Sequence, residues 1–154
     1  MARESLFKGK SKKSGKWYEG AYFYGPRIWK LRGFPCSEDP RYHFILTPDG
    51  GIIEIDIKTR CEYSGVTDKN GNRIWEGDVF EYRESKERFV VRHGTYTHSN
   101  TEFENTNIGF YADWQIETTM RKDLLFWVNH RDINLIGNIF ENPELLEGGG
   151  ENAN

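Results

Sequence analysis

The chain has 154 residues, of which 36% are hydrophobic, 15% aromatic and 29% charged, with a formal net charge of −3. A chain of this length buries roughly 68–70% of its unfolded surface, so it requires neither disulfides nor a metal to fold. The two cysteines, Cys36 and Cys61, form no Cys-x-x-Cys pair and have no neighbouring His at metal-site spacing, which argues against a zinc site. One disulfide or two free thiols remain, and we predict free thiols in a reducing cytosol.

Targeting signals are absent from the pattern. The basic N-terminus is not followed by the apolar stretch of a secretory signal. No apolar run approaches the roughly 20 residues that a membrane helix requires. We therefore predict a soluble, cytoplasmic protein without a membrane partner.

Charge is distributed unevenly along the chain. Residues 1–32 contain nine Lys or Arg residues and two Glu residues, a balance of +7, so the remainder carries −10. Such an asymmetry indicates either an electrostatic binding face or a contact between the two halves of the chain.

The N-terminal residues have the composition of a β-hairpin. Residues 6–24 consist of an entering arm, a polar turn at 10–15 and an aromatic returning arm at 16–24, which predicts two paired strands. A further short strand is predicted at 28–31, followed by a proline-containing loop at 33–40.

A second hairpin is predicted from residues 42–47 and 52–57, joined by the turn cluster Pro48-Asp49-Gly50-Gly51. In its second arm isoleucine alternates with acidic residues, which is typical of a strand with one wet face. The predicted buried face is formed by Ile53, Ile55 and Ile57.

The stretch from Tyr63 to Tyr82 is the most informative part of the chain. Two strand-like arms flank Asp68-Lys69-Asn70-Gly71, and Asn-Gly predicts a hairpin turn because both residues tolerate positive φ. Gly77-Asp78 predicts a second bend, in which the carboxylate accepts a nearby backbone N–H. The alternation of residues 79–82 predicts a half-buried strand.

Strands are also expected in the second half of the chain. A strand at 88–93 is ended or bent by Gly94, and the polar residues 95–107 leave their conformation open. Further strands are predicted at 108–111, at 124–128 as a buried apolar run, at 133–136 and at 138–140.

The C-terminus carries a helix-start signal. Asn142-Pro143-Glu144 places an N-cap, a proline and an acid in the order of a first helical turn, whereas residues 147–154 predict a disordered tail. Short strands with frequent turns indicate an antiparallel barrel or sandwich, and the pattern alone does not choose between them.

Three segments resemble the YopX family of bacteriophage and prophage proteins. The central one runs through Tyr63-Ser64-Gly65, Thr67 to Gly71 and Ile74 to Val79. The opening and closing segments are Phe7-Lys8-Gly9-Lys10 with Gly15-Lys16-Trp17 and Gly20, and Leu135 to Leu146.

The resemblance implies a domain organisation. Residues 61–146 would form a small Src-homology-3-like antiparallel β-barrel, with N-terminal β-hairpins in residues 1–60 and a tail at 147–154. It also implies a phage-associated accessory role, but it supplies no ligand.

Two carboxylates, Glu76 and Asp78, flank a glycine. They have the chemistry of an acid–base pair or a site for a hard cation. Carboxylates at a bend more often cap backbone donors, and the sequence suggests no third ligand. An enzyme with a carboxylate site here is therefore an alternative, not the main prediction.

His130-Arg131-Asp132 has the spelling of a kinase catalytic loop. The match ends quickly, because Gly137 stands where that loop requires Asn, and a solvated turn is predicted instead. His93 and His98 lack the companions of a metal motif. We thus predict no catalytic, metal-binding or cofactor-binding residues, and no cofactor.

The basic, aromatic start of the chain is the best functional lead. Cations neutralise phosphates and exposed rings stack on bases, although a lysine-rich tip also protects a sheet edge from aggregation. The candidate nucleic-acid residues are Lys10, Lys12, Lys13, Lys16, Trp17 and Tyr18.

Taken together, these patterns predict a non-enzymatic module that binds a protein partner or itself through exposed strand edges. Nucleic-acid binding through the basic hairpin is the first alternative, and an enzyme with a site near Glu76 and Asp78 is the second.

Overall fold

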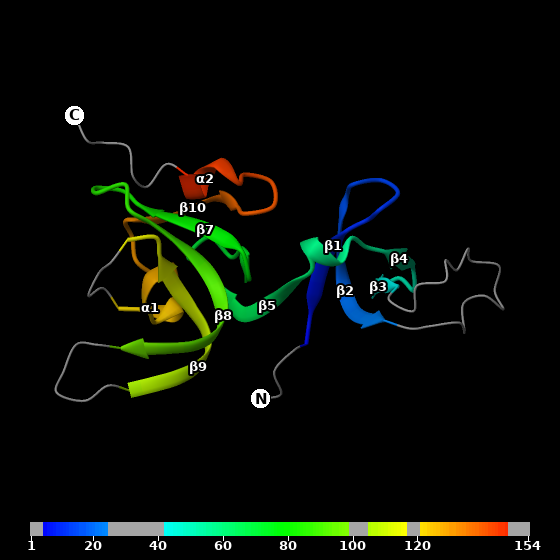
Figure 1. Ribbon diagram of the computed structural model, residues 1–154, viewed down its shortest axis with the longest axis horizontal. Helices are drawn as coiled ribbons and strands as arrows, with labels where there is room; N and C mark the ends of the chain where they lie inside the picture. Colours follow the sequence, from blue (N-terminus) through cyan, green and yellow to red (C-terminus); the bar gives the residue numbers. More distant parts are fainter. Residues whose placement is uncertain (1–4, 25–41, 99–104, 117–120, 148–154) are drawn as a thin grey trace. The chain divides into compact units, whose positions relative to one another are not determined.

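A computed structural model describes residues 5–24, 42–98, 105–116 and 121–147 (Figure 1). The chain divides into two compact units, unit 1 (Met1–Tyr63) and unit 2 (Ser64–Asn154). Antiparallel strands dominate both units, which confirms the prediction of a mainly β protein. The strand predicted at 28–31, the loop at 33–40 and Cys36 lie outside the described residues.

Unit 1 is an antiparallel sheet with the order β4-β3-β2-β1. Both predicted hairpins are confirmed, and at the other edge the first residues of β5 pair with β1, Cys61 opposite Lys8 and Glu62 opposite Phe7. The strands are β1 (Phe7–Lys10), β2 (Trp17–Tyr24), β3 (His43–Leu46), β4 (Ile52–Glu54) and β5 (Cys61–Thr67).

Two glycines allow close packing in this sheet. A Cβ atom at Gly20 would lie 2.0 Å from the carbonyl oxygen of Leu46, and one at Gly9 would lie 2.5 Å from Cδ1 of Ile55. Ile55 is fully buried. Both glycines belong to the opening segment that resembles the family.

The second arm of the β3–β4 hairpin is shorter than predicted. β4 ends at Glu54, and residues Ile57–Thr59 form a 3-10 helix whose first turn is capped by the Asp56 carboxylate, which accepts the N–H of Lys58 at 3.0 Å. Ile57 is consequently 39% exposed and not on the buried face. A local Asx-type hydrogen bond thus overrode the alternating pattern.

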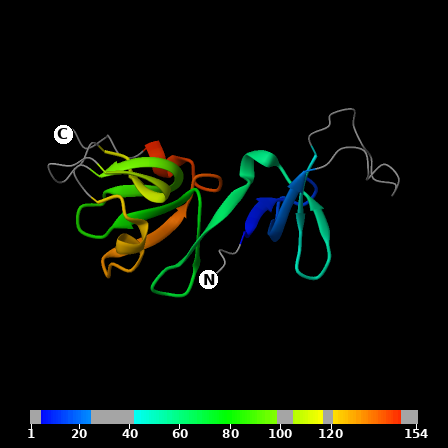
Figure 2. The same ribbon diagram turned by 90° about the horizontal axis from the view of Figure 1, so that it is seen from below.

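Unit 2 contains the hairpin of β5 and β6 (Arg73–Trp75) and a four-stranded sheet with the order β10-β7-β8-β9. The strands of this sheet are β7 (Asp78–Tyr82), β8 (Arg88–His98), β9 (Asn105–Trp114) and β10 (Ile133–Asn138). β10 and β9 are its two edges and do not pair with each other in the described residues, so a closed Src-homology-3-like barrel is not confirmed (Figures 1 and 2).

The β8–β9 hairpin is longer than the two strands predicted at 88–93 and 108–111. Gly94 does not end β8, because it pairs with Gly109 inside a continuous ladder that reaches His98 and Asn105. The Thr- and Tyr-containing sequence beyond Gly94 favours extended backbone. Part of the stretch 95–107, whose conformation the sequence does not determine, is therefore strand.

Residues Leu124–Val128 form helix α1, so the buried strand predicted there was wrong. Leu124 and Val128 are buried one turn apart, whereas Leu125 and Phe126 between them are 61% and 43% exposed. A short apolar run has the same appearance in a buried strand and in a helix, and periodicity cannot separate the two.

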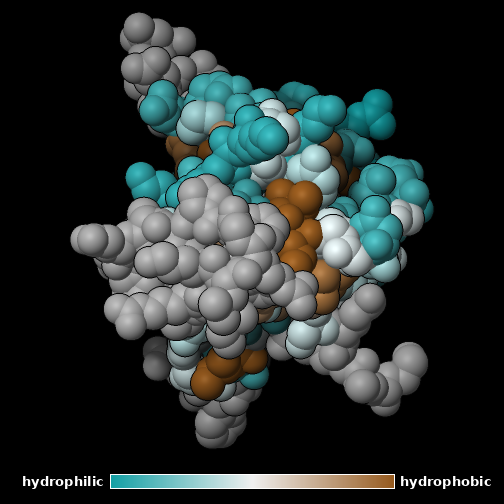
Figure 3. All heavy atoms as spheres, turned by 90° about the vertical axis from the view of Figure 1, so that its right-hand side faces the viewer, coloured by the Kyte–Doolittle hydropathy of each residue, from teal (hydrophilic) through white to brown (hydrophobic). Residues whose placement is uncertain are grey.

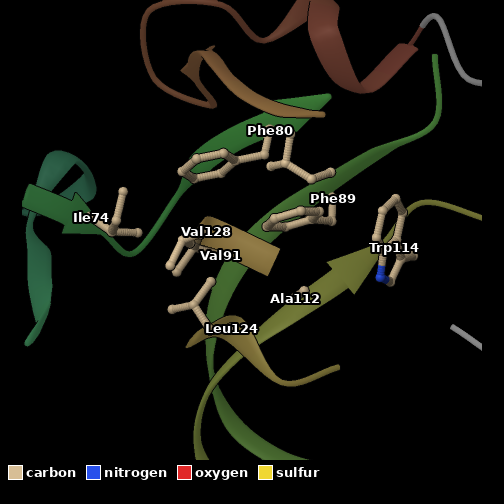
Figure 4. Close-up of a cluster of buried hydrophobic side chains, with 9 residues drawn as sticks. Ile74, Phe80, Phe89, Val91, Ala112, Trp114, Leu124 and Val128 are labelled. Carbon is tan, nitrogen blue, oxygen red and sulfur yellow. The ribbon is translucent and has the colours of Figure 1, made fainter. Parts of the chain in front are cut away.

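The core of unit 2 lies between α1, the β5–β6 hairpin and one face of the sheet (Figure 4). Aromatic rings fill much of it, with the centroids of Phe80 and Phe89 5.1 Å apart and those of Phe89 and Trp114 5.0 Å apart. The buried residues of this cluster are Ile74, Phe80, Phe89, Val91, Ala112, Trp114, Leu124, Val128 and Ile133.

Helix α2 (Glu144–Glu147) confirms the short terminal helical turn predicted after Asn142. The tail beyond Glu147 lies outside the described residues. In the described part of the chain the helices have at most five residues, and none could cross a bilayer.

Candidate functional site

The turn between β5 and β6 is a hairpin loop, as predicted, but with different backbone geometry. The N–H of Gly71 donates to the carbonyl of Asp68 at 3.0 Å, and the N–H of Asp68 donates to the carbonyl of Asn72 at 2.9 Å. Gly71 has φ of 82°, whereas Asn70 is not among the described residues with positive φ. This is the pattern of a three-residue loop with a glycine bulge, so only one residue of the Asn-Gly pair requires the left-handed region.

The carboxylate of Asp68 stabilises this loop. It accepts the N–H groups of Asn70 and Asn72, both at 2.9 Å, and the side-chain amide of Asn72 at 3.0 Å. Burial by itself would raise the pKa of Asp68, but these hydrogen bonds and the charge of Lys69 outweigh it, so the pKa is lowered. Asp68 is therefore an architectural acid, held in its charged form.

Lys69 connects the same loop to the segment that precedes β10. Its ammonium donates to the carbonyl oxygens of Arg131 at 2.8 Å and Ile133 at 2.7 Å. Longer contacts reach the carbonyl of His130 at 3.5 Å and Oδ1 of Asn134 at 3.4 Å. One cation thus satisfies several backbone acceptors at a chain reversal.

Within the Glu76-Gly77-Asp78 bend, Asp78 has the backbone-capping role that the sequence predicts. Oδ2 of Asp78 accepts the N–H of Trp75 at 2.9 Å, and Asp78 is only 5% exposed. Gly77 has φ of 90°, and a Cβ atom there would lie 2.9 Å from Cε2 of Phe140. Glu76 is half-buried, and no set of three or more His, Cys, Asp or Glu side chains in the described residues could hold a metal ion.

The segment His130-Arg131-Asp132 is the solvated turn predicted from its failed kinase match. The side chain of Arg131 is 91% exposed and lies 3.2 Å from Oδ2 of Asp132. The N–H of Asp132 donates to Nδ1 of His130 at 3.2 Å. His93 contacts the ring of Phe110 at 4.7 Å between centroids, and the side chain of His98 lies outside the described residues.

One face of the β1–β2 hairpin brings lysines and tryptophan together. Lys10 pairs directly with Trp17, and the ammonium groups of Lys8 and Lys10 lie 4.8 Å and 5.5 Å from the centroid of the Trp17 ring. These are cation–π distances. Lys8 was not among the predicted residues, although its alternation with Lys10 along β1 would have identified it.

The other predicted nucleic-acid residues lie elsewhere. Tyr18 follows Trp17 in β2 and so belongs to the opposite face of the sheet. Lys12 lies 3.4 Å from Oε1 of Glu54. Lys13 and Lys16 are exposed in the hairpin tip. The six candidates therefore do not form one site.

The opposite face of unit 1 carries aromatic residues that are not among the six candidates, although Tyr22 belongs to the aromatic arm that follows them. Tyr22, His43 and Phe7 lie close together, and the guanidinium of Arg60 is 4.6 Å from the centroid of the Tyr22 ring. Only the pairing of β1, β2 and β3 brings these residues together. Figure 3 shows hydrophobic surface (brown) beside hydrophilic side chains (teal) at the end of unit 1, and Leu46 and Ile57 are exposed hydrophobic residues of this unit.

In unit 2 the outer edge of β9 is one of the two edges of the four-stranded sheet, and it is only partly covered by described residues. On that side β9 makes a bridge between Tyr111 and Asp123, and the N–H of Ala112 donates to Lys122. Beyond Tyr111, toward the hairpin tip, Ile108 is 80% exposed. Residues 94–97 and 106–111 of the hairpin contain no Asp, Glu, Lys or Arg.

Comparison with known proteins finds a matching family and a similar solved structure. A family model described as YopX protein matches residues 7–147, most of the chain. Protein EF1440 from Enterococcus faecalis, known from its crystal structure, is similar with a TM-score of 0.44 and 19% sequence identity, covering 94% of this chain and 99% of that one. No curated protein matches.

Proposed function

The chain belongs to the YopX family, and from this membership we propose that it is a non-enzymatic binding module, an accessory protein of a bacteriophage or prophage. It acts in the host cytoplasm by binding a protein partner or a second copy of itself. Its contact surface is the outer edge of β9.

Three polar residues of the central family-like segment, Asp68, Lys69 and Asp78, support a binding module because their side chains form hydrogen bonds with the backbone. Asp68 closes the β5–β6 loop, Lys69 binds the carbonyl of Ile133 at the start of β10, and Asp78 caps Trp75. Each of these polar groups already has an internal partner. The conspicuous acids of the sequence are therefore used to build the scaffold.

The single observation that carries the proposal is the β9 edge. By alternation along β9, Ile108 lies on the same face of the sheet as the core residues Ala112 and Trp114. Unlike them, it is 80% exposed. Natural edge strands are usually protected by charged residues, proline or bulges. The described outer part of this hairpin has no charged residue, which suits strand addition by a partner.

The experiment is a measurement of association with a matched pair of variants. Ile108→Asp places a charge on the edge, whereas Leu125→Asp changes another exposed hydrophobic residue of unit 2, 61% exposed on α1. Sedimentation over a range of concentrations tests self-association, and co-purification from phage-infected cells tests a foreign partner. We expect Ile108→Asp to weaken one of these associations and Leu125→Asp to preserve it. A chain that stays monomeric and captures nothing, or associations indifferent to Ile108→Asp, would contradict the proposal.

A second candidate function is nucleic-acid binding through unit 1. The observation that favours it is that the ammonium groups of Lys8 and Lys10 both lie within cation–π distance of the Trp17 ring, a combination of cation and ring found in single-strand binders. The test is binding at low salt, with Lys12, Lys13 and Lys16 changed to Glu. Absence of binding to single and double strands would remove this candidate.

An enzyme with a carboxylate site near Glu76 and Asp78 is the third candidate and has the least support. Asp78 is nearly buried and already accepts the N–H of Trp75. Hydrolysis or group transfer by the purified protein, abolished by Glu76→Gln or Asp78→Asn in a folded variant, would reverse this order.

A further inference from the structure

A row of rings crosses the face of the unit 1 sheet opposite Trp17. It consists of Phe7, Tyr22, His43 and Tyr24, and we call it the ring row. Centroid distances are 5.5 Å from Phe7 to Tyr22, 5.8 Å from Tyr22 to His43 and 6.3 Å from His43 to Tyr24. The Tyr22 hydroxyl lies 2.6 Å from Nδ1 of His43, a hydrogen-bond distance, which fixes the Tyr22 ring.

Arg60 lies over one end of the ring row. Its guanidinium carbon is 4.6 Å from the centroid of Tyr22 and 5.9 Å from that of Phe7. Cation–π attraction to two rings restrains the guanidinium plane, and a restrained guanidinium keeps its N–H donors in a fixed fork.

The donors of Arg60 are not used within the described residues. Four other arginines have a carboxylate partner there, namely Arg88, Arg92, Arg121 and Arg131. Arg60 forms no ion pair and no side-chain hydrogen bond with any described residue, and it is exposed. A planar, positioned guanidinium with unused donors matches the bidentate geometry of a phosphate group.

The other end of the ring row offers a surface for a base. Tyr24 is 68% exposed, the highest value among the large hydrophobic residues that the structure describes in unit 1. Exposed rings bind bases of any sequence by stacking. Residues 1–63 contain 12 Lys or Arg and 8 Asp or Glu residues, so unit 1 carries +4 while the chain as a whole carries −3. A positive unit attracts a polyanion such as nucleic acid more strongly than it attracts a protein surface of mixed charge.

We propose that the ring row and Arg60 bind a short single strand of nucleic acid, with a phosphate on the Arg60 guanidinium and a base stacked on Tyr24. This inference rests on the second candidate function, nucleic-acid binding by unit 1, and assigns that function a different site. It moves the binding site from the lysine-rich tip and Trp17 to the opposite face of the sheet.

The experiment is fluorescence anisotropy of a labelled oligothymidylate with the full chain, over NaCl concentrations from about 50 to about 200 mM. Arg60→Gln removes the proposed phosphate contact, and Tyr24→Leu removes the stacking ring. Arg83→Gln is the matched control, because Arg83 is an exposed arginine that likewise forms no ion pair in the described residues and is not within a cation–π contact. Tyr22→Phe retains the ring beneath Arg60 and checks the packing of the sheet.

Each change has its own signature. Affinity falls as salt rises, and we expect Arg60→Gln to make the slope of log affinity against log salt less steep by about 0.7, the effect of losing one single-strand phosphate contact. We expect Tyr24→Leu to weaken binding about fivefold or more with the slope unchanged. Arg83→Gln should change neither quantity. Circular dichroism establishes that each variant is folded.

The outcomes separate this inference from the function on which it rests. If the unaltered chain binds no strand at low salt, the nucleic-acid function fails and the inference fails with it. If the chain binds, and only the variant with Lys12, Lys13 and Lys16 changed to Glu loses affinity, the function stands and the ring row is overturned as its site. Equal losses for Arg60→Gln and Arg83→Gln would also overturn it, because they indicate non-specific attraction.

Discussion

Replacing Lys69 by Met tests whether the family signature acts through the backbone. The change keeps an unbranched side chain of similar length but removes the ammonium that donates to Arg131 at 2.8 Å and Ile133 at 2.7 Å. The carbonyls at the reversal before β10 would then depend on water. We expect unit 2 to lose stability without a change of fold.

The magnitude follows from the two short hydrogen bonds. Hydrogen bonds to a charged group contribute about 1.5–3 kcal/mol each, which sets an upper value of about 6 kcal/mol. Releasing an ordered lysine returns up to about 2 kcal/mol of side-chain entropy. Since these carbonyls lie near the surface and regain hydration, we expect a net loss of about 1–3 kcal/mol in the free energy of unfolding.

The assay is urea unfolding followed by tryptophan fluorescence, with hydrogen exchange to localise the change to residues 130–134. Lys86→Met is the matched control, because Lys86 lies in the same unit with its side chain 68% exposed, 3.5 Å from Glu81. Exposed ion pairs contribute about 0–1 kcal/mol. If Lys69→Met costs no more than Lys86→Met, and exchange at 130–134 is unchanged, the structural role assigned to Lys69 is refuted.

Three further predictions concern other parts of the scaffold. Because the pKa of Asp68 is lowered in the folded state, its charged carboxylate stabilises unit 2 fully above the unfolded pKa of about 3.9, and this stabilisation is lost as the pH falls through the lower folded pKa. Urea unfolding should therefore show that Asp68→Asn is less stable than the unaltered chain at neutral pH and that the difference shrinks in acid. A difference that does not depend on pH would contradict this. Gly20→Ala should prevent folding of unit 1 or cost more than about 3 kcal/mol of stability, since its Cβ would lie 2.0 Å from the Leu46 carbonyl oxygen. Gly15→Ala, which has open space around it and φ of 70°, should cost only about 1 kcal/mol. Similar losses of stability for the two variants in thermal unfolding would disprove the close packing of Gly20 against Leu46. Phe80→Ala should cost about 3–5 kcal/mol, because Phe80 is 1% exposed in the core of unit 2, and a loss under about 1 kcal/mol by denaturant titration would show that this core is not packed as described.

Local chemistry was sufficient for the turns and for most of the strands. Asp68 to Gly71, Gly77-Asp78 and Asn142-Pro143-Glu144 act on neighbours within a few residues, and the structure has the predicted loop, cap and helical turn at these places. Where local signals conflicted or one signal was ambiguous, the pattern failed. The Asp56 cap ended the β4 arm early, and the apolar run at 124–128 became a helix.

The sites depended on long-range pairing. Lys69 meets carbonyls more than 60 positions away, and Arg60 meets Tyr22 only because β1 lies between β2 and the start of β5. Alternation along a strand predicts which residues share a face, but not which strand will lie beside it.

By itself, then, the sequence determined the mainly β character, the positions of the tight turns and the membership of the family. Only the tertiary structure decided that the β10-β7-β8-β9 sheet keeps two separate edges, that the lysines of the first hairpin are divided among different surroundings, and that an arginine lies over a row of rings. The physical reason is range: turns and caps are set by contacts between near neighbours, whereas sheet order and shared faces are set by contacts between strands that the linear pattern does not relate.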